Sequence, residues 1–171
     1  MYKNGTVCRI IGIIKQSFGG GEEKEYYVLD TLCENSSRIY LPTDSDIKLR
    51  HVLTPEEIRN TLNEAAEEIK NADGDVSESP LWRDNQKERA LYFASITESG
   101  DRVMILRMIS LLVHYREKLT GSKKKLCAAD ERCLATAMKL INEEFSFVLG
   151  IPRDDVTGYI TGRLKQHTDK M

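Results

Sequence analysis

The segment SPLWRDNQKER, residues 79–89, combines residue types that bind polyanions. It holds Trp82, the only tryptophan of the chain, together with the cations Arg83, Lys87 and Arg89. Basic side chains neutralise phosphates and release counterions, and an aromatic side chain can wedge between bases. The composition of this segment therefore favours contact with a nucleic acid. A solvated helix face and a core tryptophan are the alternatives.

The excess of basic over acidic residues is confined to the region around this segment. The 171 residues carry a net charge of −2, yet residues 80–126 hold ten Lys or Arg against five Asp or Glu. Residues 52–79 hold two cations and eight anions. A basic stretch within a near-neutral protein is typical of a contact with a phosphate backbone. A tryptophan in a loop directly before a basic helix is expected to be exposed enough to act as a minor-groove wedge.

Residues that could carry catalysis or bind a metal do not form a recognisable set. Catalysis needs a nucleophile, a base and an orienting group that converge, and the histidines and acidic pairs are scattered. We expect the acidic pairs to be solvated, and we expect no enzymatic activity and no cofactor. The four cysteines form no CxxC pair, which makes a zinc site or a disulfide framework unfavourable. The residues concerned are His51, His114, His167, Glu67–Glu68, Glu143–Glu144, Asp154–Asp155, Cys8, Cys33, Cys127 and Cys133.

The pattern of the first 52 residues is that of strands. Short runs rich in β-branched and aromatic residues predict strands near 6–14, 25–32 and 36–42. Gly19-Gly20-Gly21 suits a hairpin loop, because no Gly-Lys-Ser/Thr sequence follows to make a phosphate cradle. In the third strand the alternation places Arg38 and Tyr40 on one face.

From Thr54 the apolar period becomes helical. Thr54-Pro55-Glu56-Glu57 has the form of a capping box with proline at the first helical position. Gly100 is suited to a left-handed cap, and Asp101 to capping the next helix. The predicted helices lie near 54–71, 84–97, 102–119, from 129 to about 149, and 154–166. The fold class is therefore α+β, a small sheet or partial barrel over 1–52 followed by an all-helical domain of about five helices over 53–171.

The chain contains no apolar stretch of the roughly 18 residues that a membrane span requires. The first residues, MYKNGTVCRIIGII, also lack the order of a signal peptide. We expect a cytoplasmic protein that makes no membrane contact.

Taken in order, several segments resemble the CarD family of bacterial transcription regulators, in the form seen in clostridial and related bacteria. The resemblance covers almost the whole chain, and Val156 and Ile160 close it. Each piece is weak alone, whereas the ordered set is specific. The segments are GTVCRI, EKEYYVL, IYLP, TPEEI, LWRDNQKER, SGD and KKLCAADERCLATAMKLINEEFSFVLGI.

The resemblance implies a Tudor-like domain over 1–52 that binds the β subunit of bacterial RNA polymerase. It implies that the helical domain touches the promoter DNA minor groove and stabilises the open promoter complex, with a tryptophan wedge that matches Trp82. The family's basic DNA contacts fall on or beside Arg83, Lys87 and Arg132, and its polymerase contact falls on Arg38 and Tyr40. A protein–protein adaptor with no DNA contact is the alternative.

The chain departs from the family pattern at its start. Family members usually begin with a further strand, and Met1-Tyr2 fall where that strand would end. A missing strand would expose a sheet edge. A weakened domain, a domain-swapped dimer and a misread start codon are the alternatives that follow.

Overall fold

The structure, a computed structural model, has two compact units. The first unit is Met1–Leu53 and the second is Thr54–Met171, so their boundary lies one residue after the position expected from sequence. A small antiparallel sheet forms the first unit and helices form the second, which confirms the predicted α+β class. The structure describes residues 1–2, 5–32, 37–47, 49–70, 77 and 79–168, without the side chains of 68–70 and 165–168.

The sheet is a meander of three strands in the order β1-β2-β3. The strands are β1 (Cys8–Gln16), β2 (Lys24–Thr31) and β3 (Arg38–Pro42), each antiparallel to the next. The loop between β1 and β2 has Gly19 and Gly20 at φ +75° and +77°, a conformation that side chains disfavour. The glycine run thus serves the hairpin, as its sequence indicates.

The two faces of the sheet differ in burial. Leu29 and Leu41 are buried on one face, where Leu29 pairs with Ile39. Arg38 and Tyr40 are both exposed on the opposite face, as the alternation predicts.

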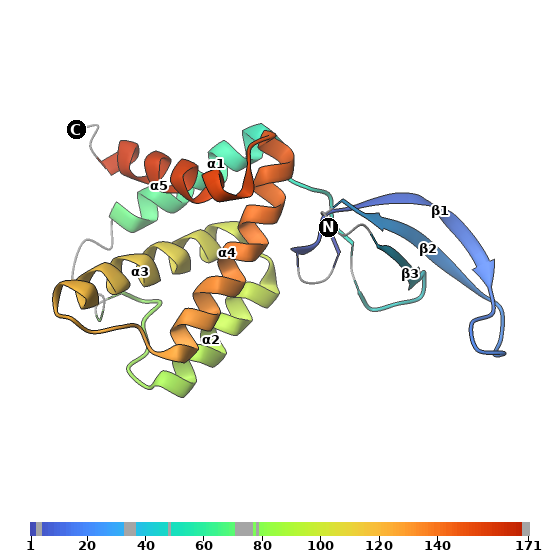
Figure 1. Cartoon of the computed structure of the whole chain (residues 1–171), viewed down its shortest axis with the longest axis horizontal. Coiled ribbons are helices and arrows are strands. Elements are labelled where there is room, and N and C mark those ends of the chain that lie inside the picture. The colour runs from blue at the N-terminus through green and yellow to red at the C-terminus, as the bar shows by residue number, and fades with distance from the viewer. Residues whose placement is uncertain (3–4, 33–36, 48, 71–76, 78, 169–171) are drawn as a thin grey trace. The chain divides into compact units, whose positions relative to one another are not determined.

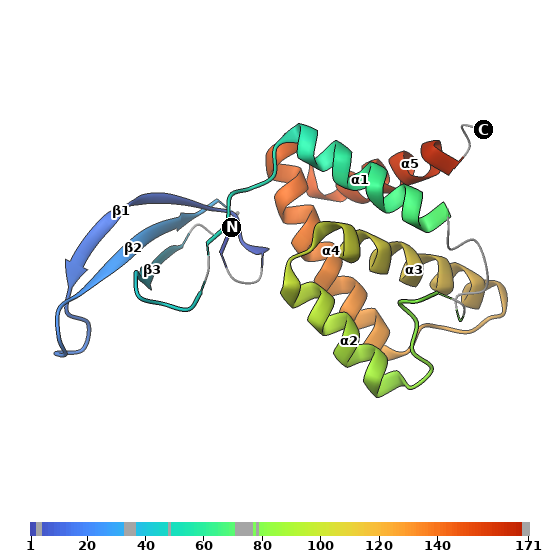
Figure 2. The same ribbon diagram turned by 180° about the vertical axis from the view of Figure 1, so that it is seen from behind.

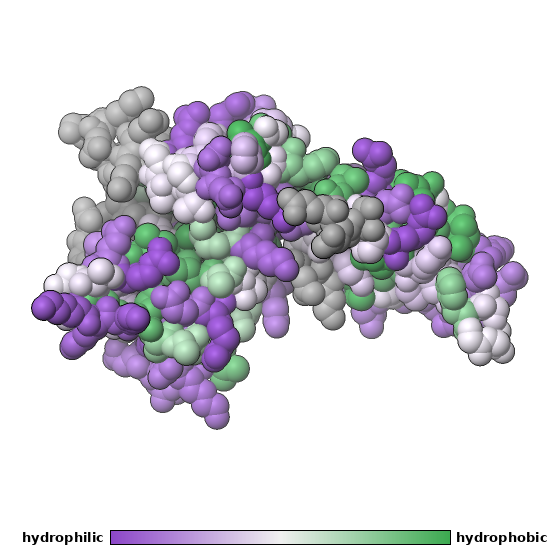
Figure 3. Space-filling view, in the orientation of Figure 1, coloured by the Kyte–Doolittle hydropathy of each residue, from purple (hydrophilic) through white to green (hydrophobic). Residues whose placement is uncertain are grey.

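The strand β1 lies at one edge of the sheet and β3 at the other. Ile11 is the extra residue of a bulge between Ile10 and Gly12, and Ile10, Ile11 and Ile13 are about half exposed. Figure 3 shows hydrophobic side chains on the visible surface of this unit. A bulge twists an edge strand and interrupts the row of free backbone groups, which hinders pairing with another chain.

The described residues of the second unit form five helices, which Figures 1 and 2 show from two sides. The helix α1 packs against α3 and α5, and α4 packs against α2, α3 and α5. The last helix is longer than predicted. The bounds are α1 (Pro55–Lys70), α2 (Gln86–Ser99), α3 (Arg102–Gly121), α4 (Ala128–Leu149) and α5 (Arg153–Thr168).

Local capping sets where these helices begin. Thr54 and Glu57 form the predicted capping box: the Thr54 N–H donates to Glu57 Oε2 at 2.7 Å and the Glu57 N–H donates to Thr54 Oγ1 at 3.2 Å. Asp101 caps α3 by accepting the Met104 N–H, as predicted. The helix α2 begins two residues later than predicted because Asn85 is its cap.

The apolar residues that the sequence indicates form the core of the helical unit, and α3 lies at its centre. Its largest fully buried side chains include Ile58 and Leu62 of α1, Phe93 of α2 and Phe145 of α4. Five residues of α3 add to it: Ile105, Leu106, Met108, Ile109 and Leu112. Of the predicted α4 stripe, Met138 and Val148 are only partly buried.

A matched pair of substitutions on α4 tests this core. Phe145 is fully buried and Phe147 is 50% exposed. Phe145→Ala should lower the free energy of unfolding of the helical unit by about 3–5 kcal/mol, through lost burial and the cavity left behind. Phe147→Ala should change it by about 0.5 kcal/mol or less. Urea unfolding followed by Trp82 fluorescence measures the free energy of unfolding of both variants. Equal losses of stability would contradict the burial of Phe145 in the core.

The capping box predicts a dependence of stability on pH. The backbone bond from Thr54, with a smaller contribution from its hydroxyl, lowers the pKa of Glu57. A lowered carboxyl pKa stabilises the folded state above the unfolded pKa, and the contribution is lost as pH falls through the folded value. Glu57→Gln should therefore lose less stability than the wild type on acidification. Glu64→Gln, at an exposed position of α1, should behave like the wild type in the same urea series.

Candidate functional site

The indole of Trp82 lies in the loop before α2 and is partly buried, not exposed as the loop position suggested. The ring of Tyr115, near the end of α3, meets it edge-on with centroids 4.7 Å apart. The guanidinium carbon of Arg89 lies 4.1 Å from the indole centroid. The loop itself is fixed by the buried Leu81 and by the Trp82 N–H, which donates to the Ser79 carbonyl at 2.8 Å. These contacts cover part of the ring and leave the rest to solvent.

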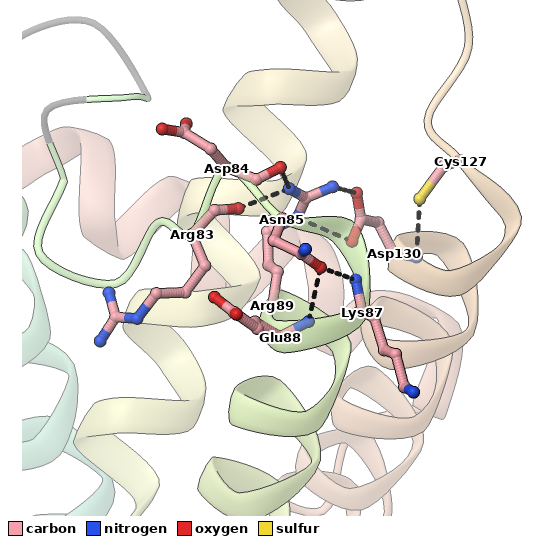
Figure 4. Close-up of polar contacts among 8 residues, drawn as sticks. All are labelled: Arg83, Asp84, Asn85, Lys87, Glu88, Arg89, Cys127 and Asp130. Atoms are coloured by element: carbon pink, nitrogen blue, oxygen red, sulfur yellow. Dashed lines mark hydrogen bonds and ion pairs between the residues drawn. The ribbon is translucent and has the colours of Figure 1, made fainter.

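Arg89 is the cation that covers the indole, and its charge is used inside the protein. Its Nε and Nη2 donate to the two carboxylate oxygens of Asp130 at 3.1 and 2.8 Å. Its Nη1 donates to the Arg83 carbonyl at 2.6 Å and more weakly to that of Asp84 (Figure 4). The bond to Asp130 raises the pKa of Arg89. Arg89 is therefore no surface cation, although the charge count included it.

Arg83 follows Trp82 and folds back over its own loop. Its Nη1 donates to the carbonyls of Pro80 and Trp82 at 2.8 and 2.6 Å. Its guanidinium carbon lies 4.4 Å from the centre of the Tyr92 ring. The side chain is partly buried. Carbonyl oxygens and a ring face do not neutralise a guanidinium, so Arg83 still contributes a positive potential beside Trp82.

Lys87 and Arg132 are exposed and come from two different helices, Lys87 from the first turn of α2 and Arg132 from the second turn of α4. Figure 4 shows the Lys87 amine directed away from Arg89 and Asp130. Lys87 and Ala129 line one shallow depression at the starts of α2 and α4. Arg132 lies three residues after Ala129, one turn along the same side of α4. The start of α4, the helix that carries Arg132, thus lies beside Lys87 of the Trp82 segment.

The positive charge that residues 80–126 leave without an internal partner is smaller than the sequence count. Arg89 and Arg102 both pair with buried carboxylates outside residues 80–126, Asp130 and Glu144. The excess of five positive charges therefore falls to three. Exposed lysines 123–125 belong to this excess and form the turn that leads from α3 to α4.

The sheet unit carries a second candidate site on the exposed face of β3. Arg38 Nε donates to Asp30 Oδ1 at 2.8 Å, which raises the pKa of Arg38 and lowers that of Asp30. The ring of Tyr40 lies 5.3 Å from that of Phe18, which in turn meets Tyr26 edge-on at 4.9 Å. Phe18 and Tyr40 are 49% and 41% exposed.

Sequence reasoning missed part of both sites. Phe18 was placed only in a hairpin loop, and its contact with β3 depends on the strand register. Tyr115 lies 33 positions after Trp82 in sequence, and no local pattern links them. Arg89 and Asp130 carry a signal, since charged side chains at apolar positions need partners when buried, but the partner could not be chosen from sequence.

The acidic pair Glu143–Glu144 corrects a further expectation. Both residues are buried rather than solvated, because α4 packs with its neighbours on several sides. Arg102 Nε donates to Glu144 Oε2 at 2.7 Å, and Arg153 lies 3.5 Å from Glu143. The carboxylates are thus parts of ion pairs.

Metal-binding geometry is not found in the described part of the chain, where no three His, Cys, Asp or Glu residues are grouped to hold an ion. Cys127 and Cys133 are free thiols, and burial raises the pKa of Cys133. Cys33 and Glu68 lie outside the residues whose side chains are described, as does His167.

Comparison with known proteins does not place the chain in a family. No family model matches it, and no match is found among curated proteins. Within the described residues, no helix is both long enough and apolar enough to cross a membrane.

The contact between Trp82 and Tyr115 predicts a spectroscopic result. Tyr115→Ala should expose the indole, shift its emission to longer wavelength and increase quenching by acrylamide. Tyr159→Ala removes a partly buried tyrosine from α5 and serves as the control. Because Trp82 is the only tryptophan, the signal has one source. Equal emission from both variants would contradict the packing of Trp82 on α3.

Proposed function

We propose that the protein is a CarD-like bacterial transcription regulator, without enzymatic activity, that acts in the cytoplasm. Its sheet unit contacts the β subunit of RNA polymerase and its helical unit contacts promoter DNA, which stabilises the open promoter complex. The observation that carries the proposal is a partly buried indole in the loop before α2, packed against Tyr115 and Arg89, with Arg83 next to it in sequence and the exposed Lys87 on the helix that follows. The ordered sequence resemblance to the CarD family supports the same conclusion.

Trp82 would act on DNA as a wedge. Proteins that bind the minor groove insert flat apolar side chains at a base step and hold the flanking phosphates with cations. The contacts of Trp82 with Tyr115 and Arg89 restrict its movement, so little conformational entropy is lost when it inserts. Lys87 and Arg132 are the exposed cations suited to the phosphates, and Arg83 supplies charge next to the ring.

Arg38 and Tyr40 would act on the polymerase. Aromatic and arginine side chains are the commonest strong contributors to protein interfaces. In this unit Tyr40 joins Phe18 and Tyr26 in one aromatic cluster, and the Asp30 ion pair orients Arg38 beside it. We therefore add Phe18 to the residues proposed for this contact.

The two contacts together would shift the closed-to-open equilibrium of the promoter. A ligand shifts such an equilibrium only by its difference in affinity for the two states. The wedge provides that difference, because a base step at the edge of melted DNA has already lost stacking. The sheet contact holds the wedge at that edge.

An adaptor that binds only proteins is the second candidate, and one observation favours it. Two of the arginines in the basic region, Arg89 and Arg102, are used in internal ion pairs, which reduces the charge available for DNA. The exposed aromatic cluster of the sheet would serve either function. Footprinting distinguishes the two, since an adaptor predicts no salt-sensitive protection near the melted start region.

The lifetime of the open complex tests the wedge. Trp82→Ala should shorten it about tenfold, as expected for loss of one base–aromatic stack. Binding to polymerase should be unchanged. Phe147→Ala removes an exposed aromatic from the same unit and should leave the lifetime as it is. A wild-type lifetime for Trp82→Ala would rule out the wedge.

Pull-down of the polymerase β subunit tests the sheet contact. The double variant Arg38→Ala, Tyr40→Ala should lose at least tenfold in affinity, the loss typical of an interface anchor. Phe18→Ala should weaken binding to a smaller degree. Ile13→Ala, an exposed residue elsewhere in the sheet, is the control. Full retention by the double variant would show that the polymerase contact lies elsewhere.

A further inference from the structure

The guanidinium of Arg89 has its donors directed at the protein, and its central carbon lies over the Trp82 ring, 4.1 Å from the centroid. Nε and Nη2 form a fork with the Asp130 carboxylate, and Nη1 points to the Arg83 carbonyl. The side chains of Arg89 and Asp130 are 7% and 1% exposed. A phosphate could reach Arg89 only by breaking a buried, two-bonded ion pair, which is strongly unfavourable.

The same contacts tie the indole to three helices. Arg89 belongs to α2, Asp130 to the first turn of α4, and Tyr115 to the last part of α3. Asp130 is itself held at the start of α4, where its N–H donates to Cys127 Sγ at 3.4 Å. A planar, two-bonded guanidinium has a fixed orientation, so the ring lying on it is restrained as well.

We propose that Arg89 is a positioning residue: fixed by Asp130, it holds the Trp82 indole in the orientation in which the ring meets DNA, and it makes no DNA contact itself. The inference rests on the proposed function for its effect on DNA. Its effect on the indole is separate and concerns the free protein. Lys87 and Arg132 remain the phosphate contacts.

A second buried ion pair of the same unit provides the control. Arg102 and Glu144 are 7% and 0% exposed and form a 2.7 Å bond, so this pair closely matches Arg89–Asp130 in burial. Arg102 is at the first turn of α3, whereas Tyr115 is 13 residues further along that helix, a separation of about 20 Å. Loss of the Arg102–Glu144 pair should destabilise the helical unit without changing the surroundings of Trp82.

The first experiment compares Asp130→Asn with Glu144→Gln in the full chain. Each removes one buried carboxylate charge, and both should lower the melting temperature. Asp130→Asn should also shift the Trp82 emission to longer wavelength and raise the acrylamide quenching constant about twofold. Glu144→Gln should leave both signals at the wild-type values. Arg89→Lys keeps the positive charge but loses the two-bonded contact with Asp130. It should therefore show the same changes in Trp82 emission and quenching, and it replaces Asp130→Asn if that variant fails to fold.

The second experiment measures affinity for a forked promoter duplex as a function of salt. Asp130→Asn and Arg89→Lys should weaken binding about three- to tenfold, because the indole must be ordered on binding. Their salt dependence should match the wild type. Lys87→Ala should instead reduce the salt slope by about one, as expected for a lost phosphate contact. Glu144→Gln should bind like the wild type.

The outcomes separate this inference from the proposed function. Trp82 signals that are the same in Asp130→Asn, Arg89→Lys and Glu144→Gln would overturn the positioning role, whatever happens with DNA. A reduced salt slope for Arg89→Lys would also overturn it, because Arg89 would then be a phosphate contact. If the wild type does not bind the duplex while the optical difference is found, the proposed function fails and Arg89 still positions the indole.

Discussion

The carboxylate of Asp130 is almost wholly out of water, and a charge in that position must have a partner. Removing one member of a buried pair leaves an uncompensated charge and costs about 3–5 kcal/mol. Arg89 meets this requirement with a two-bonded fork. The arrangement of α2 against α4 therefore has little freedom at this point, and the Trp82 loop, Tyr115 and the exposed cations depend on it.

The two units expose different kinds of side chain at their surfaces. In the helical unit, Arg89 and Arg102 form internal ion pairs, whereas several lysines and Arg132 lie at the surface. The sheet unit exposes aromatic rings and isoleucines instead. A surface of this kind favours protein contacts, whereas a half-buried indole among cations favours a nucleic acid. This division is consistent with the proposed role as a regulator that bridges RNA polymerase and DNA.

Structural features that depend on residues close together in the chain could be predicted from the sequence. The capping box at Thr54, the cap at Asp101 and the turn at Gly100 all follow from local hydrogen bonding and φ preferences. The three strands and the five helices were found for the same reason, with boundaries wrong by a residue or two. The acidic pair Glu143–Glu144 was misjudged, because burial depends on which helices pack around α4.

The sequence alone determined the fold class, the caps at Thr54, Gly100 and Asp101, the alternation on β3 and the presence of a lone tryptophan near many cations. It could not determine which of those cations are available. Only the tertiary structure decided that Arg89 is paired with Asp130, that Arg83 lies over Tyr92, and that Lys87 lies near the start of α4. The reason is physical: capping and strand alternation involve neighbours in the chain, whereas ion pairs and ring contacts join residues that only the packing of helices brings together.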